Sequence, residues 1–157
     1  MNKLEEWERD DVITLELPED ARDEALSGTS LTRHEKAQSF ISSEPLPSTP
    51  QERERLIEIE HILFPAGAAT ASEKRDVMIV FTADKYGAVL ITNDGDSKRQ
   101  PGGILGNSQL LAELQIRVMT DKEACEEVKR KIESRDNHAR RYCQRTGKAL
   151  PYWVGKD

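Results

Sequence analysis

The sequence predicts an α/β fold in which helices cover both faces of a parallel sheet. Short apolar segments rich in β-branched residues alternate along the chain with longer segments of helical periodicity. The connections between these segments are short, and this combination is typical of parallel sheets with crossover helices. The chain has 157 residues, of which 36% are hydrophobic, so one domain with a moderate core is expected.

Three helices and one strand are expected in the N-terminal part. Met1–Asp11 is expected to be the end of a helix, because its two large apolar residues lie one turn apart. Val12–Leu17 (VITLEL) predicts a strand from its β-branched residues and partial alternation. Pro18 ends that strand and suits the first turn of a helix over Glu19–Leu26. A third helix is expected over Leu31–Ile41.

Proline and capping residues delimit the middle of the chain. Ser42–Pro50 contains three prolines and three serines and is therefore expected to be a loop. Glu52–Leu63 has its apolar residues on one side of a helix. Ser72 is the expected N-cap of the next helix, which has Glu73 in its first turn and runs to Lys85.

Two further strands are expected in the last part of the chain. Ala88–Thr92 (AVLIT) is a continuous apolar run, which suits a buried parallel strand. Ile116–Met119 (IRVM) is the second strand. Loops are expected at Asn93–Asp96 and from Gly102–Gly103 onward. A short helix capped by Asn107 or Ser108 is expected to end at Leu114. A long helix capped by Thr120 or Asp121 is expected over Lys122–Thr146.

Composition excludes several classes of protein. The longest uncharged apolar run, Val77–Ala83, is far shorter than the roughly 20 residues of a membrane helix. Met1–Asp11 lacks the apolar stretch of a secretory signal. Cys125 and Cys143 lie in one expected helix, about 27 Å apart, so they cannot bridge each other. A cytoplasmic location and no membrane association are therefore expected.

Charge is distributed unevenly along the chain. The formal net charge is −6. Met1–Glu24 holds ten acids and three bases, whereas Lys129–Asp157 holds nine bases and three acids. The acidic total therefore does not exclude a nucleic-acid partner for the C-terminal part.

The carboxylates after the strand Ala88–Thr92 are the strongest candidate site. Thr92 ends this strand, and Asn93, Asp94 and Asp96 come directly after it. Ligands of open α/β sheets bind at the carboxyl ends of strands. Carboxylate and amide oxygens suit hard divalent cations. The alternative is a turn, since Asn-Asp-Gly favours left-handed conformations.

Two other acids are candidates on neighbouring helices. Asp76 directly precedes the apolar run Val77–Ala83. It is either an acid that complements a helix N-terminus or a carboxylate directed into a cleft. Glu24 lies among other acids on the helix that follows the first expected strand, where solvated acids are the simpler interpretation.

Together these segments resemble the PIN-domain family, whose members are metal-dependent nucleases that mostly cut RNA. The resemblance covers most of the chain, from Trp7 to about Ile132. Four segments carry it. VITLELPEDARDEAL places the family's acidic residue at Glu24, and Asp76 is followed by the apolar VMIVFTA. Leu90-Ile-Thr-Asn-Asp94, followed by Asp96, is similar to the family's Leu-Val-Thr-Asn-Asp, and Leu114–Met119 with Glu123 is similar to the family's last strand and helix start.

The resemblance implies a three-layer α/β/α fold with a parallel sheet. The PIN-like domain would cover residues 1–132, with a Pro- and Ser-rich insertion at 42–50, followed by a basic helix end and tail at 133–157. It also implies a catalytic and metal-binding set that holds Mg²⁺ or Mn²⁺ and hydrolyses RNA phosphodiesters, consisting of Glu24, Asp76, Asp94 and Asp96. Thr92 and Asn93 would position the substrate.

The sequence departs from the family pattern at its start. PIN domains open with a strand that ends in a catalytic Asp, and no such strand precedes Met1. A truncated form, a wrongly started reading frame and loss of activity are the three interpretations. The alternative function is therefore a catalytically inactive PIN-like module that binds RNA or a protein partner. Members of the family often dimerise, so the resemblance leaves a homodimer as one option, and the sequence alone does not give the oligomeric state.

The basic C-terminal part has two interpretations of its own. Its bases include Arg140, Arg141 and Arg145, with aromatic residues nearby. Bases interleaved with aromatics suit single-stranded RNA, and these arginines are expected to contact it. The simpler interpretation is a solvated helix end whose cations complement the helix dipole.

Overall fold

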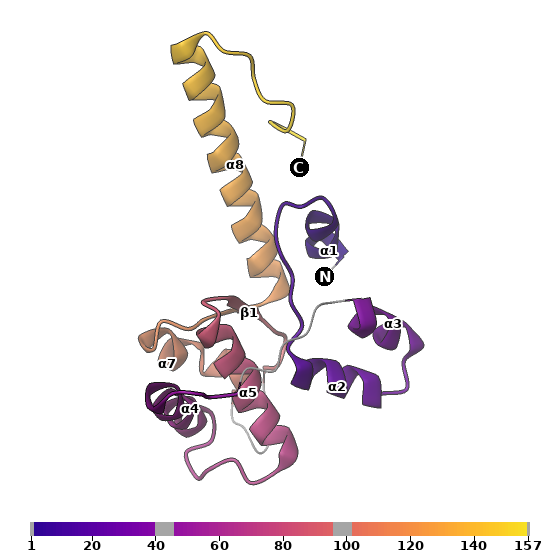
Figure 1. Ribbon diagram of the computed structural model, residues 1–157, viewed down its shortest axis with the longest axis vertical. Helices are drawn as coiled ribbons and strands as arrows, with labels where there is room; N and C mark the ends of the chain where they lie inside the picture. Colours follow the sequence, from indigo (N-terminus) through magenta and orange to yellow (C-terminus); the bar gives the residue numbers. More distant parts are fainter. Residues whose placement is uncertain (1, 40–45, 96–101, 157) are drawn as a thin grey trace. The chain divides into compact units, whose positions relative to one another are not determined.

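The structure is a computed structural model that describes residues 2–39, 46–95 and 102–156 (Figure 1). The chain divides into two compact units. Unit 1 consists of Met1–Leu15 and Asp121–Asp157, and unit 2 consists of Glu16–Thr120. The fold is mixed α/β and mostly helical, with a two-stranded parallel sheet in the described part of the chain.

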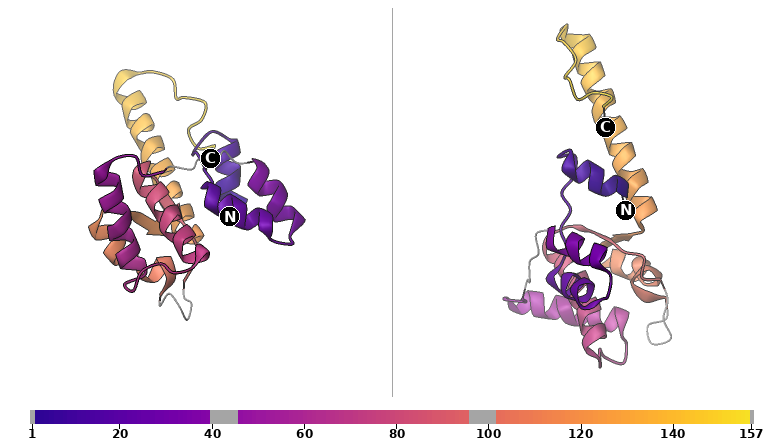
Figure 2. Two further views of the ribbon diagram at one scale, coloured as in Figure 1. Left: turned by 60° about the horizontal axis from the view of Figure 1, so that its bottom comes forward. Right: turned by 90° about the vertical axis from the view of Figure 1, so that its right-hand side faces the viewer.

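Unit 1 is built on two helices. They are α1 (Asn2–Arg9) and α8 (Asp121–Thr146). Leu4 and Trp7 of α1 and Ala124 of α8 are buried. After α8 the chain turns at Gly147 and a tail runs back along the helix (Figures 1 and 2).

Unit 2 contains the remaining elements. In chain order these are α2 (Glu19–Ser27), α3 (Leu31–Ser39), α4 (Pro50–Leu63), α5 (Ala71–Lys85), β1 (Val89–Ile91), α6 (Gly103–Gly106), α7 (Ser108–Glu113) and β2 (Arg117–Met119). The apolar run of α5 forms the centre of the core, where Val80 and Phe81 are almost completely buried. Helices α2 and α4 and strand β1 all pack against α5, because a helix that is apolar on several sides needs cover on each of them.

The two strands pair in parallel. Leu90 lies opposite Val118, and the N–H of Thr92 extends the pairing by donating to the Met119 carbonyl at 3.1 Å. The connection between the strands carries α6 and α7. Both strands were predicted from their apolar composition, and both predictions are confirmed.

The predicted strand at Val12–Leu17 is wrong. This segment is irregular and lies where the chain passes from unit 1 to unit 2, without a ladder partner among the described residues. Thr14 and Glu16 are exposed, and the apolar residues beside them are half-buried. The alternation of apolar and polar residues therefore belongs to a half-buried extended segment. The periodicity of the sequence alone cannot distinguish such a segment from a paired strand.

Two smaller expectations are corrected and most helices are confirmed. The N-cap of α5 is Thr70, not Ser72, and Thr70 forms a capping box with Glu73. Gly102 does not open a loop but is the left-handed N-cap of α6. The helices expected over 1–11, 19–26, 52–63, 108–114 and 122–146 are present with small shifts of their ends. The helix expected over 31–41 is present over 31–39, and residues 40–41 lie outside the described part of the chain. Part of the expected loop at 42–50 lies outside the described residues.

No helix among the described residues is both long and apolar enough to cross a membrane. The longest helix, α8, carries both cysteines, as expected, and both thiols are free.

Arg55 of α4 joins three parts of unit 2. Its Nε donates to Asp84 Oδ2 of α5 at 2.9 Å, and its Nη2 donates to the Leu114 carbonyl after α7 at 2.7 Å. Both bonds are partly buried. Arg55 therefore fixes the polar edge of the packing between α4, α5 and α7.

We expect Arg55→Leu to lower the free energy of unfolding by about 1–2 kcal/mol, because the Leu114 carbonyl and Asp84 lose a charged donor. Urea unfolding followed by circular dichroism measures this change. Arg53→Leu on the exposed side of α4 is the matched control and should change stability by less than about 0.5 kcal/mol. Equal effects of both substitutions would contradict the role of Arg55.

Candidate functional site

Asp94 lies just beyond the carboxyl end of β1 and is held there by backbone groups. Its N–H donates to Thr92 Oγ1, its carbonyl accepts the Leu105 N–H, and its Oδ2 accepts the Ile104 N–H, each at 3.1 Å. The first turn of α6 therefore fixes both the peptide and the carboxylate of Asp94.

Gly103 makes this contact possible. It is buried, with φ at +55°, a conformation that L side chains rarely adopt. An added Cβ would lie 2.8 Å from the Asp94 carbonyl oxygen and 2.9 Å from its Oδ2. A side chain at this position would displace Asp94 or α6.

The Asp94 carboxylate keeps capacity for a ligand. Asp94 and Asn93 are exposed, and Thr92 is half-buried. Among the described residues, the one hydrogen bond given to this carboxylate comes from Ile104. A carboxylate has about four lone-pair sites, so most of them can accept from a cation or water.

The helices that carry the other predicted acids pack next to one another. Asp76 is half-buried in the second turn of α5, and it has a partner of its own. Helix α2, which carries Glu24, packs against α5, and α5 packs against β1. The side chain of Glu24 and all of Asp96 lie outside the described residues. Within the part that is described, no three His, Cys, Asp or Glu side chains are grouped so as to hold a metal.

The predicted arginines belong to unit 1, at the end of α8. Arg141 Nε donates to the carbonyl of Asn137 at 3.3 Å, whereas Arg140 Nη2 lies 3.8 Å from Asp136 Oδ2. Arg145 is exposed in the last turn. These arginines and Asp94 thus belong to different compact units.

Asp136 attaches the C-terminal tail to α8. Its side chain is only 6% exposed. Its Oδ1 accepts two bonds from Arg135, at 3.1 and 2.9 Å, and its Oδ2 accepts the Gly155 N–H at 2.6 Å. Arg135 also lies over the ring of Trp153, 4.5 Å from its centre. Burial raises the pKa of Asp136, but the bonds from Arg135 and Gly155 outweigh it and hold the pKa below 3.8.

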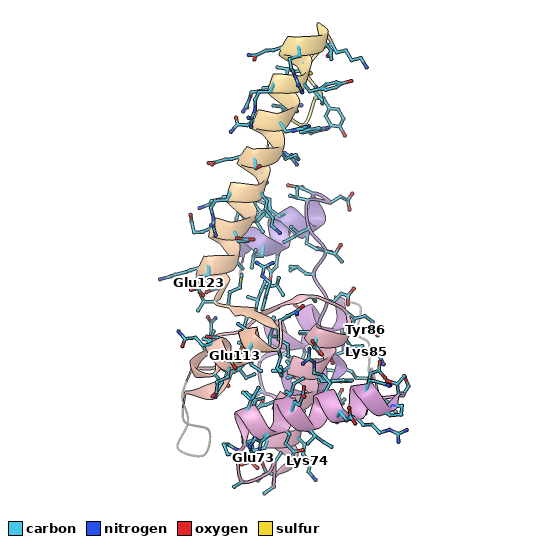
Figure 3. All side chains as sticks on the ribbon, turned by 90° about the vertical axis from the view of Figure 1, so that its left-hand side faces the viewer. Glu73, Lys74, Lys85, Tyr86, Glu113 and Glu123 are labelled. Atoms are coloured by element: carbon cyan, nitrogen blue, oxygen red, sulfur yellow. The ribbon has the colours of Figure 1, made fainter. Side chains whose placement is uncertain are left out.

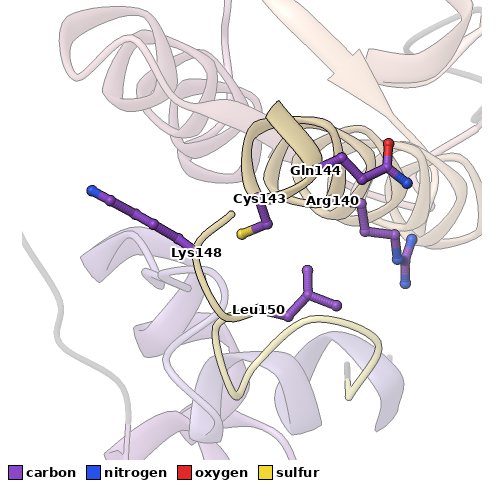
Figure 4. A pocket seen from close by; sticks show the side chains of 5 residues that line it. All are labelled: Arg140, Cys143, Gln144, Lys148 and Leu150. Carbon is purple, nitrogen blue, oxygen red and sulfur yellow. The ribbon is translucent and has the colours of Figure 1, made fainter. Parts of the chain in front are cut away.

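Two adjacent hollows lie along the end of α8. The first, of about 350 Å³, is lined by Arg140, Cys143, Gln144, Lys148 and Leu150. In Figure 4, Cys143 and Leu150 face each other, with Arg140 and Gln144 on one side and Lys148 on the other. The second, of about 340 Å³, is lined by His138, Arg141, Gln144 and Arg145. Gln144 is common to both hollows.

Sequence reasoning missed three residues of these two regions. Gly103 was treated as loop, and its role depends on a close approach that no sequence signal marks. Asp136 was counted as one acid in a basic segment. Lys148 was not singled out from the other bases, although no acid occurs from Asn137 to Lys156, and that run was a usable signal.

No protein-family model, curated protein or solved structure matches this chain. The functional argument therefore rests on the residues and their chemistry.

We expect Gly103→Ala to lower the free energy of unfolding by about 1–3 kcal/mol, because its Cβ has no room and its φ is positive. Gly106→Ala is the control three residues away, where no atom lies within 4 Å of an added Cβ. It should leave stability unchanged or slightly raised. Thermal unfolding of both variants tests the packing of α6 against Asp94, and equal stabilities would disprove it.

We expect acid to release the tail from α8. The pKa of Asp136 is lower in the folded chain than the usual 3.8, so attachment is stabilised above pH 3.8 and is lost as the pH falls through the folded value. The amide signal of Gly155 should shift in that step when followed by NMR. In Asp136→Asn the step should disappear, and a Gly155 shift that persists would refute the attachment.

Proposed function

We propose that this chain is a PIN-like, metal-dependent ribonuclease-family protein whose reaction centre lies at the carboxyl end of β1. The observation that carries the proposal is the position of Asp94, an exposed carboxylate fixed directly after a parallel strand. Ligand sites of parallel sheets lie at this end of the strands. The three-layer arrangement with helices on both sheet faces is part of the same proposal.

The path of the chain supports a site shared by Asp94 and Asp76. From Asp76 to Lys85 helix α5 advances about 13 Å, and a three-residue connection at 86–88 then leads into β1. Because the connection is short and β1 packs against α5, we expect the chain to run back along the helix, over roughly 17 Å for residues 89–94 if they are extended. The two acids are therefore expected at similar heights along the α5–β1 pair.

The donor chemistry fits Mg²⁺ or Mn²⁺. Asp94 and Asp76 would be ligands, with Glu24 from α2 and Asp96 completing the set. A divalent ion in such a site lowers the pKa of a bound water and stabilises charge on a phosphodiester. The hydrogen bonds of Asp94 to α6 would orient its carboxylate before the ion binds. Thr92 and Asn93 would position the substrate beside it.

A second candidate function is an inactive PIN-like module that binds RNA or a protein partner. The observation that favours it is the unbalanced positive charge at the end of α8, which lies outside unit 2. The two functions differ in whether a cation is needed for the effect on RNA.

We expect the full chain to cleave end-labelled single-stranded RNA in Mn²⁺ or Mg²⁺ and not in EDTA. Asp94→Asn keeps the acceptor for Ile104 but loses the charge, so cleavage should fall by more than about 100-fold. Glu113→Gln is the control, because Glu113 is exposed on α7 (Figure 3). Gel electrophoresis of the products measures both.

Manganese binding separates the two functions further. Under the nuclease proposal, Mn²⁺ at a hundredfold excess over its dissociation constant stabilises the chain by about 2.7 kcal/mol, and Asp94→Asn removes this stabilisation. Cleavage that survives Asp94→Asn would refute the assigned site. If the chain neither cleaves RNA nor binds Mn²⁺, the inactive PIN-like module is the function that remains.

A further inference from the structure

The last turns of α8 and the tail are rich in cations and poor in acids. From Asn137 to Lys156 the sequence has five Arg and Lys residues and no Asp or Glu. The preceding segment Asp121–Asp136 has five bases and six acids. One helix therefore combines a nearly neutral first part with a strongly basic end.

Ion pairing sharpens this contrast. Lys129 pairs with Glu126 at 2.9 Å, and Glu127 pairs with Arg130 at 2.9 Å and with Lys131 at 3.7 Å. Each of these three cations therefore has a counter-charge within one helical turn.

At the end of the helix the situation is reversed. Among the described residues, no carboxylate pairs with Arg141, Arg145 or Lys148. Lys148 instead donates to the hydroxyl of Tyr142 at 3.3 Å and lies over its ring. The ring of Tyr142 is itself exposed.

The free cations lie at surface hollows. Arg141 and Arg145 are one turn apart and line the second hollow, and Lys148 lines the first. Helical spacing also places Tyr142 beside Arg145. We call Arg141, Tyr142, Arg145 and Lys148 the basic surface.

We infer that the basic surface binds single-stranded nucleic acid. Unpaired cations beside shallow hollows suit successive phosphates, and an exposed ring among them suits an unstacked base. An acidic peptide would meet the charges but has no base to stack on the ring. Arg140 has a smaller role, since it lies 3.8 Å from Asp136. This inference does not depend on the proposed metal site.

Binding is measured with the full chain in EDTA, by fluorescence anisotropy of labelled twelve-nucleotide oligouridylate and oligothymidylate. Arg141→Gln, Arg145→Gln and Lys148→Gln are combined in one variant. Its affinity should fall at least about tenfold, and the plot of log K against log salt should become shallower by about 2, for three lost phosphate contacts. The two probes differ in the ribose hydroxyl and in the 5-methyl group of the base, and a preference for either one supports the inference.

The matched control lies on the same helix. Lys129→Gln, Arg130→Gln and Lys131→Gln together remove three charges from ion-paired positions. Affinity should change less than threefold and the salt slope should be retained. Equal losses in the two triple variants would overturn the inference, because net charge alone would then explain binding.

The ring distinguishes nucleic acid from other polyanions. Tyr142→Leu should weaken binding about fivefold or more, whereas Tyr86→Leu, at an exposed tyrosine of unit 2, should not. If polyglutamate or phosphatidylserine vesicles displace the probe as well as unlabelled oligouridylate does, the partner is not a nucleic acid. Asp94→Asn should bind normally, so failure of the metal site and failure of the basic surface give different results.

Discussion

The burial of α5 is the constraint on which the arrangement of unit 2 depends. Val77, Val80, Phe81 and Ala83 are all nearly inaccessible to solvent, so the helix must be covered on several sides at once. Helix α4, helix α2 and strand β1 provide that cover. Strand β1 follows α5 after a three-residue connection, packs against it and pairs in parallel with the later strand β2. The position of the polar residues after β1 therefore depends on the burial of the apolar residues of α5.

A carboxylate that receives a backbone N–H appears in both units, and the contrast between the two cases limits what each can do. Asp94 takes one such bond at 3.1 Å and is exposed, so its position is defined while its charge stays available. Asp136 is buried, and Arg135 and Gly155 give it three bonds. Its charge is neutralised and its lone pairs are largely used. The first carboxylate suits a ligand, whereas the second holds the chain together.

The sequence allows prediction of those elements whose signal is local. The apolar run of β1 and the amphipathic or capped helices were predicted because a few neighbouring residues determine them. The capping box Thr70–Glu73 was also readable, since Thr and Glu stand three apart, but Ser72 was chosen instead. The strand predicted at Val12–Leu17 was wrong for a different reason. A strand needs a neighbouring strand to pair with, and the local sequence does not show whether one is present. The Thr-Asn-Asp loop was found from sequence, but the bonds that fix Asp94 come from Ile104 and Leu105 and need a close approach of Gly103, nine residues further along the chain.

Formal charge is a poor guide to where this chain meets a polyanion, because pairing decides which charges are available. The net charge of −6 does not show which surface can bind a polyanion, and the number of bases along α8 does not show it either. Lys129, Arg130 and Lys131 look as favourable in sequence as Arg141 and Arg145, yet they face glutamates one turn away. Arg140 differs from Arg141 by a single position, which turns it toward Asp136. What distinguishes the end of α8 is therefore the absence of acids within a helical turn rather than the number of bases. The buried acid before it, Asp136, pairs with Arg135 and Arg140 and holds the tail. In the described part of the chain, Arg141, Arg145 and Lys148 are left without a carboxylate partner.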